Sequence, residues 1–185
     1  MAFLDRDEID SIGFKQIGTN VLISSSAAFY RAEEISIGNN VRIDDYTCLS
    51  GRIKLGAYIH IGTHCHFAGG ELGIEIGDFS GFASGVNIFT RSDDYLGLAL
   101  SNPTIPEEFR LIREEPIQIG RHVKAGIRSI ILPGSKIGDG CAIQLNSVVS
   151  GSTKPFHFYS GDPAVERAEL STRILDEERR FLEKG

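Results

Sequence analysis

A pair of neighbouring carboxylates is the clearest candidate for chemistry in this chain. Asp93 and Asp94 stand in the run Ser92-Asp93-Asp94-Tyr95, where one of them could hydrogen-bond an amine, fix its direction and accept or relay its proton. The alternative for each is a structural role, because Ser and Asp side chains commonly cap turns. Both aspartates are therefore candidate catalytic residues at an acceptor site.

Histidines form a second group of side chains that could react or bind a metal. His60, His64 and His66 surround Cys65 within seven residues. Histidine and cysteine are the usual protein ligands of zinc. Whether the three histidines could act together depends on the elements that carry them.

Length and composition favour one soluble globular domain. The chain has 185 residues, of which 41% are hydrophobic and 24% charged, and a net charge of −6. An acidic balance argues against nucleic acid as the main partner, and no run of about 18 apolar residues could span a membrane. Three widely spaced cysteines fit reduced thiols, and the acidic N-terminus is unlike a signal peptide. We expect a cytoplasmic protein.

Apolar residues recur every six positions over most of the chain. This spacing is neither that of an α-helix nor that of an isolated strand, and it predicts a β-solenoid whose coils have three flat faces. The fourth residue beyond each periodic position is usually small or β-branched, as a narrow interior requires. All fifteen periodic positions are apolar: Ile37, Ile43, Leu49, Leu55, Ile61, Phe67, Ile76, Phe82, Ile88, Ile119, Ala125, Ile131, Ile137, Ile143 and Val149.

The six-residue period breaks twice. The first break is short and lies near Gly69–Gly73, and the second lies between Ile88 and Ile119. Removal of one regular step from the second break leaves residues 92–116 outside the coils. We expect an extruded loop there that contributes to binding, to subunit packing or to both.

The two ends of the chain follow other patterns. Residues 164–184 contain neither glycine nor proline and show helical spacing of apolar residues, which predicts a C-terminal α-helix that covers the open end of the solenoid. A short helical turn is expected between Asp5 and Leu22. The prediction is a single domain over residues 1–185, with the β-helix occupying 1–163.

The chain resembles the left-handed β-helix acyltransferases built from hexapeptide repeats, in particular the branch that acetylates sugars. The segments that carry the resemblance are GFKQIGTNVLIS (13–24), ISIGNNVRIDDYTCLSG (35–51), SDDYLG with NPTIPEEF (92–109), ILPGSKIG (131–138) and SGDPA (160–164). The resemblance implies a left-handed parallel β-helix and a homotrimer. It also implies acetyl-CoA or another acyl-CoA in a cleft between subunits, and a sugar, free or nucleotide-linked, under the extruded loop. The expected context is bacterial surface-polysaccharide biosynthesis.

The family's usual base is missing from the start of the loop. Many relatives place a histidine there to deprotonate a sugar hydroxyl, whereas this chain has Arg91, which stays protonated. An amine needs less help than an alcohol, so N-acylation of an amino sugar is favoured over O-acetylation. His66 is the candidate base if the acceptor is a hydroxyl. Ser84, Arg91 and Tyr95 are the candidate substrate-binding residues.

The expected cofactor strip lies in residues 122–134, HVKAGIRSIILPG. Relatives have small residues at its turn, and this chain has the larger Ile127 and Arg128. Residues 117–155 carry a net charge of +4 and the loop 92–116 carries −4, which suits an anionic cofactor beside a cationic acceptor. Scattered surface charge is the alternative. The candidate cofactor-binding residues are Gly126, Ile127, Arg128, Ser129, Asn146 and Lys154.

The sequence also allows other interpretations. His64 and His66 would point the same way while His60 lies on another face, and zinc hydratases of this fold collect their three histidines from two subunits at a different spacing, so we expect no metal. Cys65 and Cys141 fall at small inward positions and are expected to pack. A solenoid without activity is also compatible with the bulky turn and the missing histidine.

Overall fold

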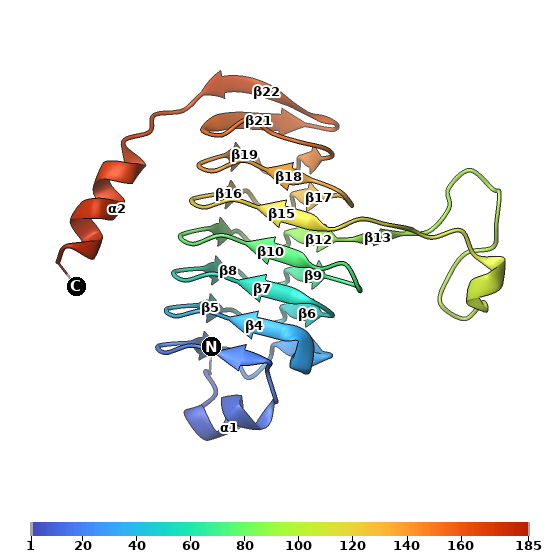
Figure 1. The fold of residues 1–185 in the computed structure, drawn as a ribbon, viewed down its shortest axis with the longest axis horizontal. Helices are drawn as coiled ribbons and strands as arrows, with labels where there is room; N and C mark the ends of the chain where they lie inside the picture. The colour runs from blue at the N-terminus through green and yellow to red at the C-terminus, as the bar shows by residue number, and fades with distance from the viewer. Residues whose placement is uncertain (1, 185) are drawn as a thin grey trace.

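The structure is a computed structural model that describes residues 2–184. Its body is a stack of coils, each of which adds one short strand to each of three parallel sheets (Figure 1). We call these the first, second and third sheets, in the order in which each coil passes through them. The first corner joins the first sheet to the second, the second corner joins the second to the third, and the third corner leads to the next coil.

Each sheet collects strands that are one coil apart in the sequence. The first contains β1 (Gln16–Ile17), β4 (Ile35–Ile37), β7 (Ile53–Leu55), β10 (Ile74–Ile76), β15 (Ile117–Ile119) and β18 (Lys136–Ile137). The second contains β2 (Leu22–Ile23), β5 (Arg42–Ile43), β8 (His60–Ile61), β11 (Gly81–Phe82), β16 (Lys124–Ala125), β19 (Ala142–Ile143), β21 (His157–Gly161) and β22 (Ala164–Glu169). The third contains β3 (Ala28–Tyr30), β6 (Cys48–Ser50), β9 (His66–Ala68), β12 (Asn87–Phe89), β17 (Ile130–Ile131) and β20 (Val148–Val149).

The predicted period is the packing period of the core. All fifteen periodic residues are buried, none more than 4% exposed, and they stack in register between coils, as Ile74, Glu75 and Ile76 do on Ile117, Gln118 and Ile119. Burial of about 25 cal/mol for each Å² of apolar surface makes this continuous column the main source of stability. The β-solenoid matches the left-handed β-helix of the prediction.

Several corners have a conformation that composition alone would assign to glycine or asparagine. Tyr58, Phe79 and His122 occupy the first corner of three successive coils with φ values of 57°, 60° and 58°. Their rings stack, with centroids 4.7 Å apart for Tyr58 and Phe79 and 5.1 Å for Phe79 and His122. Stacking between coils offsets the cost of the left-handed backbone in these residues.

The ends of the solenoid are closed by different elements. Helix α1 (Arg6–Ser11) lies beneath the first coil, and Asp5 and Glu8 form a capping box at its start. The predicted helix over 164–184 is only partly correct. Residues 164–169 form β22, which pairs antiparallel with β21 and ends the second sheet, because the last coil would otherwise expose an unpaired strand edge. Helix α2 (Ile174–Leu182) is shorter and lies beside the first corner, not over the open end (Figure 1).

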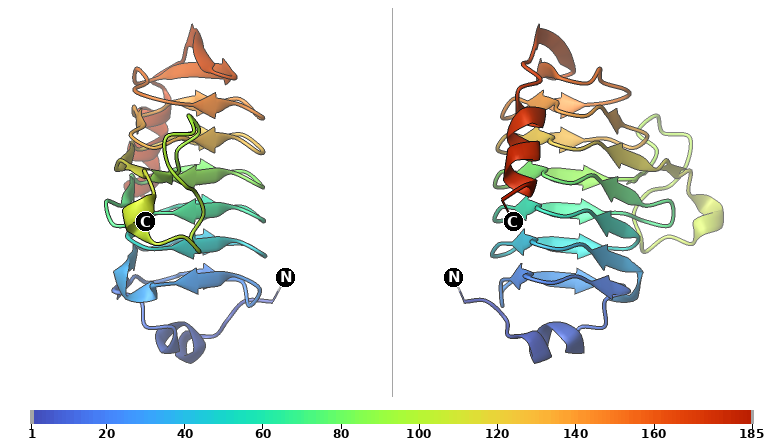
Figure 2. Two further views of the ribbon diagram at one scale, coloured as in Figure 1. Left: turned by 90° about the vertical axis from the view of Figure 1, so that its right-hand side faces the viewer. Right: turned by 60° about the vertical axis from the view of Figure 1, so that its left-hand side comes forward.

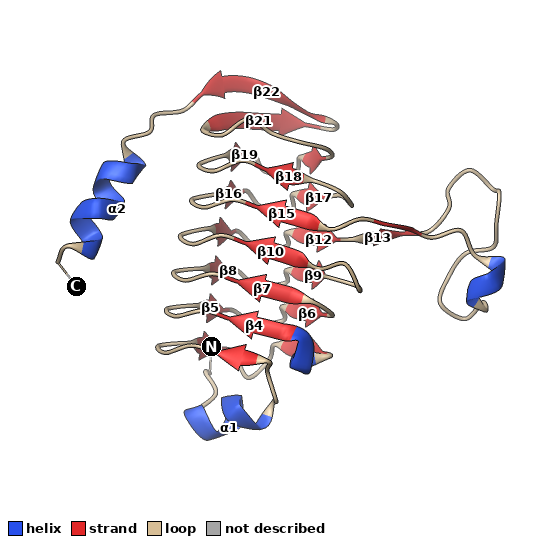
Figure 3. Cartoon of the chain, in the orientation of Figure 1, coloured by secondary structure: helices blue, strands red, loops and turns tan. Residues whose placement is uncertain are grey.

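The extruded loop leaves the solenoid between β12 and β15, as predicted. Its base is a two-stranded antiparallel stalk, β13 (Arg91–Ser92) with β14 (Arg113–Glu114), and its outer part carries the 3-10 turn η2 (Glu107–Phe109) (Figure 3). A second 3-10 turn, η1 (Ala32–Glu34), lies at the third corner. The loop stands out from the side of the molecule opposite α2 (Figures 1 and 2). Helix and loop therefore cannot share a site within one chain.

Candidate functional site

The second corner brings together most of the residues predicted to bind the cofactor. Successive coils contribute Ser84, then Gly126–Ser129, then Asn146, and backbone hydrogen bonds fix their stacking. The Arg128 N–H donates to the Ser84 carbonyl at 3.0 Å, and the Asn146 N–H donates to the Ile127 carbonyl at 2.8 Å. These residues therefore form one continuous strip along the solenoid axis.

The strip has an apolar side and a polar end. Ile127 is 49% exposed and lies one coil from Leu145, which is 54% exposed. At the polar end the hydroxyl groups of Thr63 and the exposed Ser84 lie 3.1 Å apart. A hydroxyl can donate one hydrogen bond and accept two, so Ser84 can still hydrogen-bond a ligand. A strip of this kind could bind a chain with both apolar and amide groups.

Ser129 does not fit its predicted role as a cofactor contact. Its side chain is fully buried, and its hydroxyl lies 2.6 Å from the Gly126 carbonyl and 3.0 Å from the Gln144 carbonyl. Ser129 is the fourth residue beyond the periodic Ala125, and the small residues at this position point into the solenoid, as the six-residue period implies. Ser129 therefore ties two turns together and offers nothing to a ligand.

Some of the basic residues in the positively charged segment 117–155 are neutralised by ion pairs. Arg121 pairs with Glu178 of α2, and Lys154 pairs with Glu166 of β22 at 2.9 Å. Glu166 raises the pKa of Lys154 through this contact. Lys154 lies at the first corner of the last coil, so its placement separates it from the strip within one chain. Arg128 has no ion-pair partner among residues 2–184 and is the cation left on the strip.

The two aspartates lie in the outer part of the loop and have different partners. Asp93 accepts hydrogen bonds from Arg110 at 2.8 Å and from the Asn102 N–H at 3.1 Å. Asp94 accepts three backbone N–H groups, from Leu96 at 2.9 Å, Leu98 at 2.5 Å and Ala99 at 3.1 Å. The structural alternative raised for both residues is therefore present for both.

These contacts set the charge state of the two carboxyl groups. The Arg110 guanidinium, followed by the Asn102 N–H, holds the pKa of Asp93 below its usual value. The Leu96 N–H has the largest effect on Asp94, and the other backbone donors add to it, so the pKa of Asp94 is also lowered. Both side chains are carboxylates at neutral pH. A permanently ionised carboxylate is a weak base but a strong hydrogen-bond acceptor.

The other predicted loop residues lie near these aspartates. Arg91 is in the stalk and pairs with Glu107 at 3.1 Å, while Tyr95 is 90% exposed. His66 is exposed on the outer face of the third sheet, beside Cys48 and Asn87 of the neighbouring strands. Within one chain, the loop residues lie apart from the strip at the second corner, whereas His66 begins the strand that follows that corner and its N–H donates to the Val86 carbonyl at 3.0 Å.

The neighbouring histidines have partners of their own. The Nε2 of His60 lies 2.8 Å from the Asp44 carboxylate, and His64 stacks on Tyr46 with ring centroids 4.9 Å apart. Across residues 2–184, no group of three or more His, Cys, Asp or Glu side chains is arranged to hold a metal ion. Cys65 and Cys141 are buried, in agreement with their predicted packing role.

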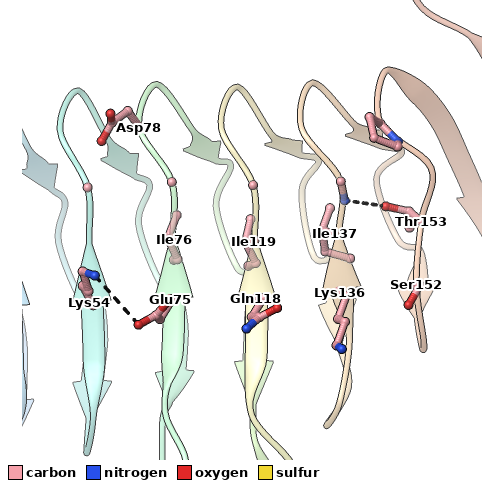
Figure 4. A pocket seen from close by; sticks show the side chains of 15 residues that line it. Lys54, Glu75, Ile76, Asp78, Gln118, Ile119, Lys136, Ile137, Ser152 and Thr153 are labelled. Carbon is pink, nitrogen blue, oxygen red and sulfur yellow. Dashed lines mark hydrogen bonds and ion pairs between the residues drawn. The ribbon is translucent and has the colours of Figure 1, made fainter.

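A groove on the first sheet was not predicted from the sequence. It has a volume of about 530 Å³, and its polar rim includes the Lys54–Glu75 pair at 3.9 Å and the side chains of Gln118 and Lys136 (Figure 4). Its opposite side is bare backbone, because each strand of the first sheet is followed by a glycine where a β-carbon would strike the next coil. It contains none of the predicted site residues.

Comparison with known proteins gives matches over the whole chain. No protein-family model matches. A curated relative from Escherichia coli, dTDP-4-amino-4,6-dideoxy-D-glucose acyltransferase, is 39% identical over 184 residues, which cover 98% of this chain and 95% of the relative. In the described part of this chain, no helix is long and apolar enough to cross a membrane.

Solved structures of AntD, an N-acyltransferase from Bacillus cereus, are similarly close. The S84A variant, in complex with dTDP-4-amino-4,6-dideoxyglucose and coenzyme A, is 38% identical with a TM-score of 0.98 and covers 100% of this chain and 99% of its own. The complex with dTDP and 3-hydroxybutyryl-CoA is 38% identical with a TM-score of 0.97 and covers 98% and 97%. The D94A variant is 38% identical, again with a TM-score of 0.97, and covers 99% and 98%.

Fold, period and full-length similarity agree with one another, and the structure keeps both the strip and the extruded loop of the predicted acyltransferase. The chain therefore belongs to the hexapeptide-repeat, left-handed β-helix acyltransferase family, in the branch that acylates sugars.

Proposed function

We propose that this protein transfers an acyl group from an acyl-CoA to the 4-amino group of dTDP-4-amino-4,6-dideoxyglucose. The observation that carries the proposal is the match over almost the full length of the chain to a relative named for this substrate, and to AntD, crystallised with the same sugar nucleotide and coenzyme A. Two features of this chain agree with an amine acceptor. The loop begins with Arg91 instead of a base, and Asp94 is a fixed carboxylate.

The chemistry requires one bond to form and one to break. The neutral amine attacks the thioester carbonyl, the C–N bond forms, and the C–S bond breaks to release coenzyme A. The amine loses a proton overall, and the thiolate takes one up. Asp94 accepts a hydrogen bond from the amine and orients its lone pair toward the carbonyl carbon.

The remaining site residues bind the sugar nucleotide and the acyl-CoA. Ser84 presents an exposed hydroxyl group next to Ile127 and contacts the substrate. Gly126, Ile127, Arg128 and Asn146 form the strip along which the pantetheine arm of the acyl-CoA lies. Support comes from the AntD variants S84A and D94A, since this chain has serine and aspartate at the same numbers and the two chains match nearly end to end. The acyl group is acetyl or a short chain such as 3-hydroxybutyryl, the donor bound to AntD.

A homotrimer completes the site. The outer part of the loop exposes a cluster of apolar side chains that a monomer would leave in water: Tyr95, Leu96, Leu98, Leu100, Phe109 and Leu111. The loop leaves the solenoid at the third corner and projects away from it (Figure 2), whereas the strip of its own chain lies at the second corner. We infer that this apolar cluster packs on a neighbouring subunit and thereby brings Asp94 to that subunit's strip.

The cellular setting follows from the substrates. A dTDP-linked amino sugar is an activated building block, so the acylated product would enter surface-polysaccharide synthesis. The three free thiols, Cys48, Cys65 and Cys141, fit a reducing cytoplasm, where acyl-CoA is available.

The test is a free-thiol release assay with acetyl-CoA and 3-hydroxybutyryl-CoA as donors. We expect turnover with the dTDP-linked 4-amino sugar and an amide product by mass spectrometry. The control acceptor is the matched dTDP-linked 6-deoxyglucose, which has a 4-hydroxyl group. Ester formation with the control at a comparable rate would support the O-acetyltransferase alternative, and no thiol release with any acceptor would support an inactive solenoid.

A further inference from the structure

Asp93 and Asp94 are adjacent, but the structure separates their roles. The Asp93 carboxylate has both oxygens engaged, one by Arg110 and one by the Asn102 N–H. Asp94 accepts backbone N–H groups alone, two at Oδ2 and that of Leu96 at Oδ1. Both carboxylates keep acceptor capacity for a ligand, because each oxygen has two lone pairs. What separates them is that Asp93 is tied to a side-chain cation from a distant part of the loop, whereas the partners of Asp94 belong to the turn that directly follows it.

The Asp93–Arg110 pair differs from the other ion pairs of the loop. The side chains of Arg110 and Asp93 are only 14% and 28% exposed, whereas those of Arg91 and Glu107 are 41% and 82% exposed. A partly desolvated pair holds its geometry better than an exposed one, because water and salt screen it less. Arg110 is therefore the most firmly held cation of the loop's ion pairs.

The position of this pair in the chain gives it a mechanical role. Asp93 lies in the outgoing limb of the loop and Arg110, 17 residues later, in the returning limb. Arg110 is also bridged through its backbone to Leu100, and the Leu100 N–H donates to the Phe109 carbonyl at 3.0 Å. The pair thus fixes the backbone that immediately precedes Asp94 against the opposite limb.

We propose that Arg110 is a positioning residue for the acyl transfer, which acts through Asp93 to hold the Asp94 carboxylate in its orientation toward the acceptor amine. The inference rests on the proposed function, because it takes Asp94 as the group that contacts the amine. Arg110 itself touches neither substrate. Loss of Arg110 leaves Asp94 ionised but lets its backbone and its carboxylate move away from the orientation toward the amine.

The test compares Arg110→Gln, Arg110→Lys and Asp93→Asn with the native trimer. We expect Arg110→Gln and Asp93→Asn each to lower kcat for the amino sugar by about 10- to 100-fold, with KM for the acyl-CoA unchanged. Arg110→Lys should recover part of the loss, since lysine keeps the charge. The double variant Asp93→Asn with Arg110→Gln should be no slower than either single variant, because both remove one interaction.

Two measurements separate positioning from general support of the fold. Hydrogen–deuterium exchange of the peptide that covers residues 94–102 should rise in Arg110→Gln, because the N–H groups of Leu98 and Ala99 lose their fixed acceptor, while exchange in the coils stays native. In the Asp94→Asn background, Arg110→Gln should leave the residual rate unchanged. The control is Arg113→Gln, which removes an exposed arginine of the stalk and should alter neither kcat nor exchange in that peptide.

The outcomes distinguish this inference from the proposed function. If Asp94→Asn itself turns over normally, the proposed role of Asp94 is wrong. If Asp94→Asn is slow while Arg110→Gln shows native kcat and native exchange at residues 94–102, the role of Arg110 is wrong. A further loss of rate on adding Arg110→Gln to Asp94→Asn also contradicts it, because Arg110 would then act independently of Asp94.

Discussion

Glu114 lies against Gly70, and this contact joins the two places where the six-residue period is broken. The Glu114 carboxylate accepts the Glu71 N–H at 2.7 Å, and a β-carbon at position 70 would collide with it. Gly70 also has a φ of 53° and adjoins the Thr90 hydroxyl. The short insertion near Gly69–Gly73 thus packs against and hydrogen-bonds β14, the strand that returns from the loop.

Gly70→Ala is expected to destabilise the protein by about 2 kcal/mol. Left-handed backbone costs a residue with a β-carbon about 1 kcal/mol, and displacement of Glu114 removes a hydrogen bond of about the same value. Gly151→Ala is the matched control, because Gly151 has a φ of 81° but no atom within 4 Å of an added β-carbon. Thermal unfolding of both variants measures the difference. Equal losses in the two would mean that the Glu114 contact adds nothing.

The sequence predicts the solenoid because the period of its core residues is a direct consequence of the coil geometry. Each periodic residue pairs with a periodic residue of the next coil, as Ile61 does with Phe82 and Ile131 with Val149, so one pattern repeats along the chain. The six-residue period does not extend to residues 164–169. The helical spacing of these residues is real, but pairing with the exposed edge of β21 outweighs local propensity.

Prediction of the site was limited for a similar reason. The residue types at Asp93 and Asp94 indicated acceptor chemistry, but their different partners, Arg110 and the backbone amides, depend on the fold of a 25-residue loop. Resemblance alone predicts a cofactor contact for Ser129, whereas its place in the six-residue period directs its side chain inward, where the structure has it.

Glu178 is expected to control the docking of helix α2. Its side chain is 9% exposed and contacts Arg121 and the buried His122, which lies 2.8 Å away. Burial would raise the pKa of Glu178, but the hydrogen bond from His122 and the charge of Arg121 outweigh it and hold the pKa below its usual value. Glu178→Ala leaves the buried His122 without its carboxylate partner and Arg121 with only the longer contact to Asp78 at 3.9 Å, and should cost about 1–3 kcal/mol.

The measurement is limited trypsin cleavage after Arg173, next to α2, followed over time. We expect faster cleavage in Glu178→Ala and a native rate in the control Glu177→Ala, whose pairs with Arg173 and Arg180 are exposed. Because the pKa of Glu178 is lowered on folding, its contribution is present at neutral pH and is lost as pH falls below about 4. Cleavage that is equally slow in both variants would mean that other contacts hold the helix.

The cysteines are expected to react in the order of their exposure. Burial raises the pKa of Cys65 to about 11 and also raises that of the half-buried Cys48. A thiol-specific reagent at pH 7.5 should modify Cys48 slowly and leave Cys65 and Cys141 intact until the protein is unfolded. Mass spectrometry of the labelled peptides gives the order. Rapid labelling of Cys65 in the native protein would contradict its packing role.

The pH dependence of turnover should report the acceptor amine and not the enzyme's carboxylates. The pKa values of Asp93 and Asp94 are both lowered, so both groups stay ionised throughout the range from pH 5 to 9. We expect kcat/KM to rise with pH in a single step as the ammonium form of the sugar loses its proton. An amino sugar of lower amine pKa should shift that step by the same amount. A second step near pH 5 to 6, common to both sugars, would reveal a titrating enzyme base instead.

The apolar cluster of the loop is expected to hold the subunits together. Leu98 is 73% exposed and Leu96 is 83% exposed, and burial of either against a neighbour would contribute about 2 kcal/mol for each subunit interface. Leu98→Asp puts a charge into that contact and should shift the protein from the proposed trimer to a monomer in light scattering at micromolar concentration. Activity should fall with the trimer fraction, because Asp94 would no longer reach a neighbouring strip. Leu72→Asp is the control, since Leu72 is half exposed at the third corner and lies outside the cluster. A Leu98→Asp protein that remains trimeric and fully active would show that the loop completes no neighbouring site.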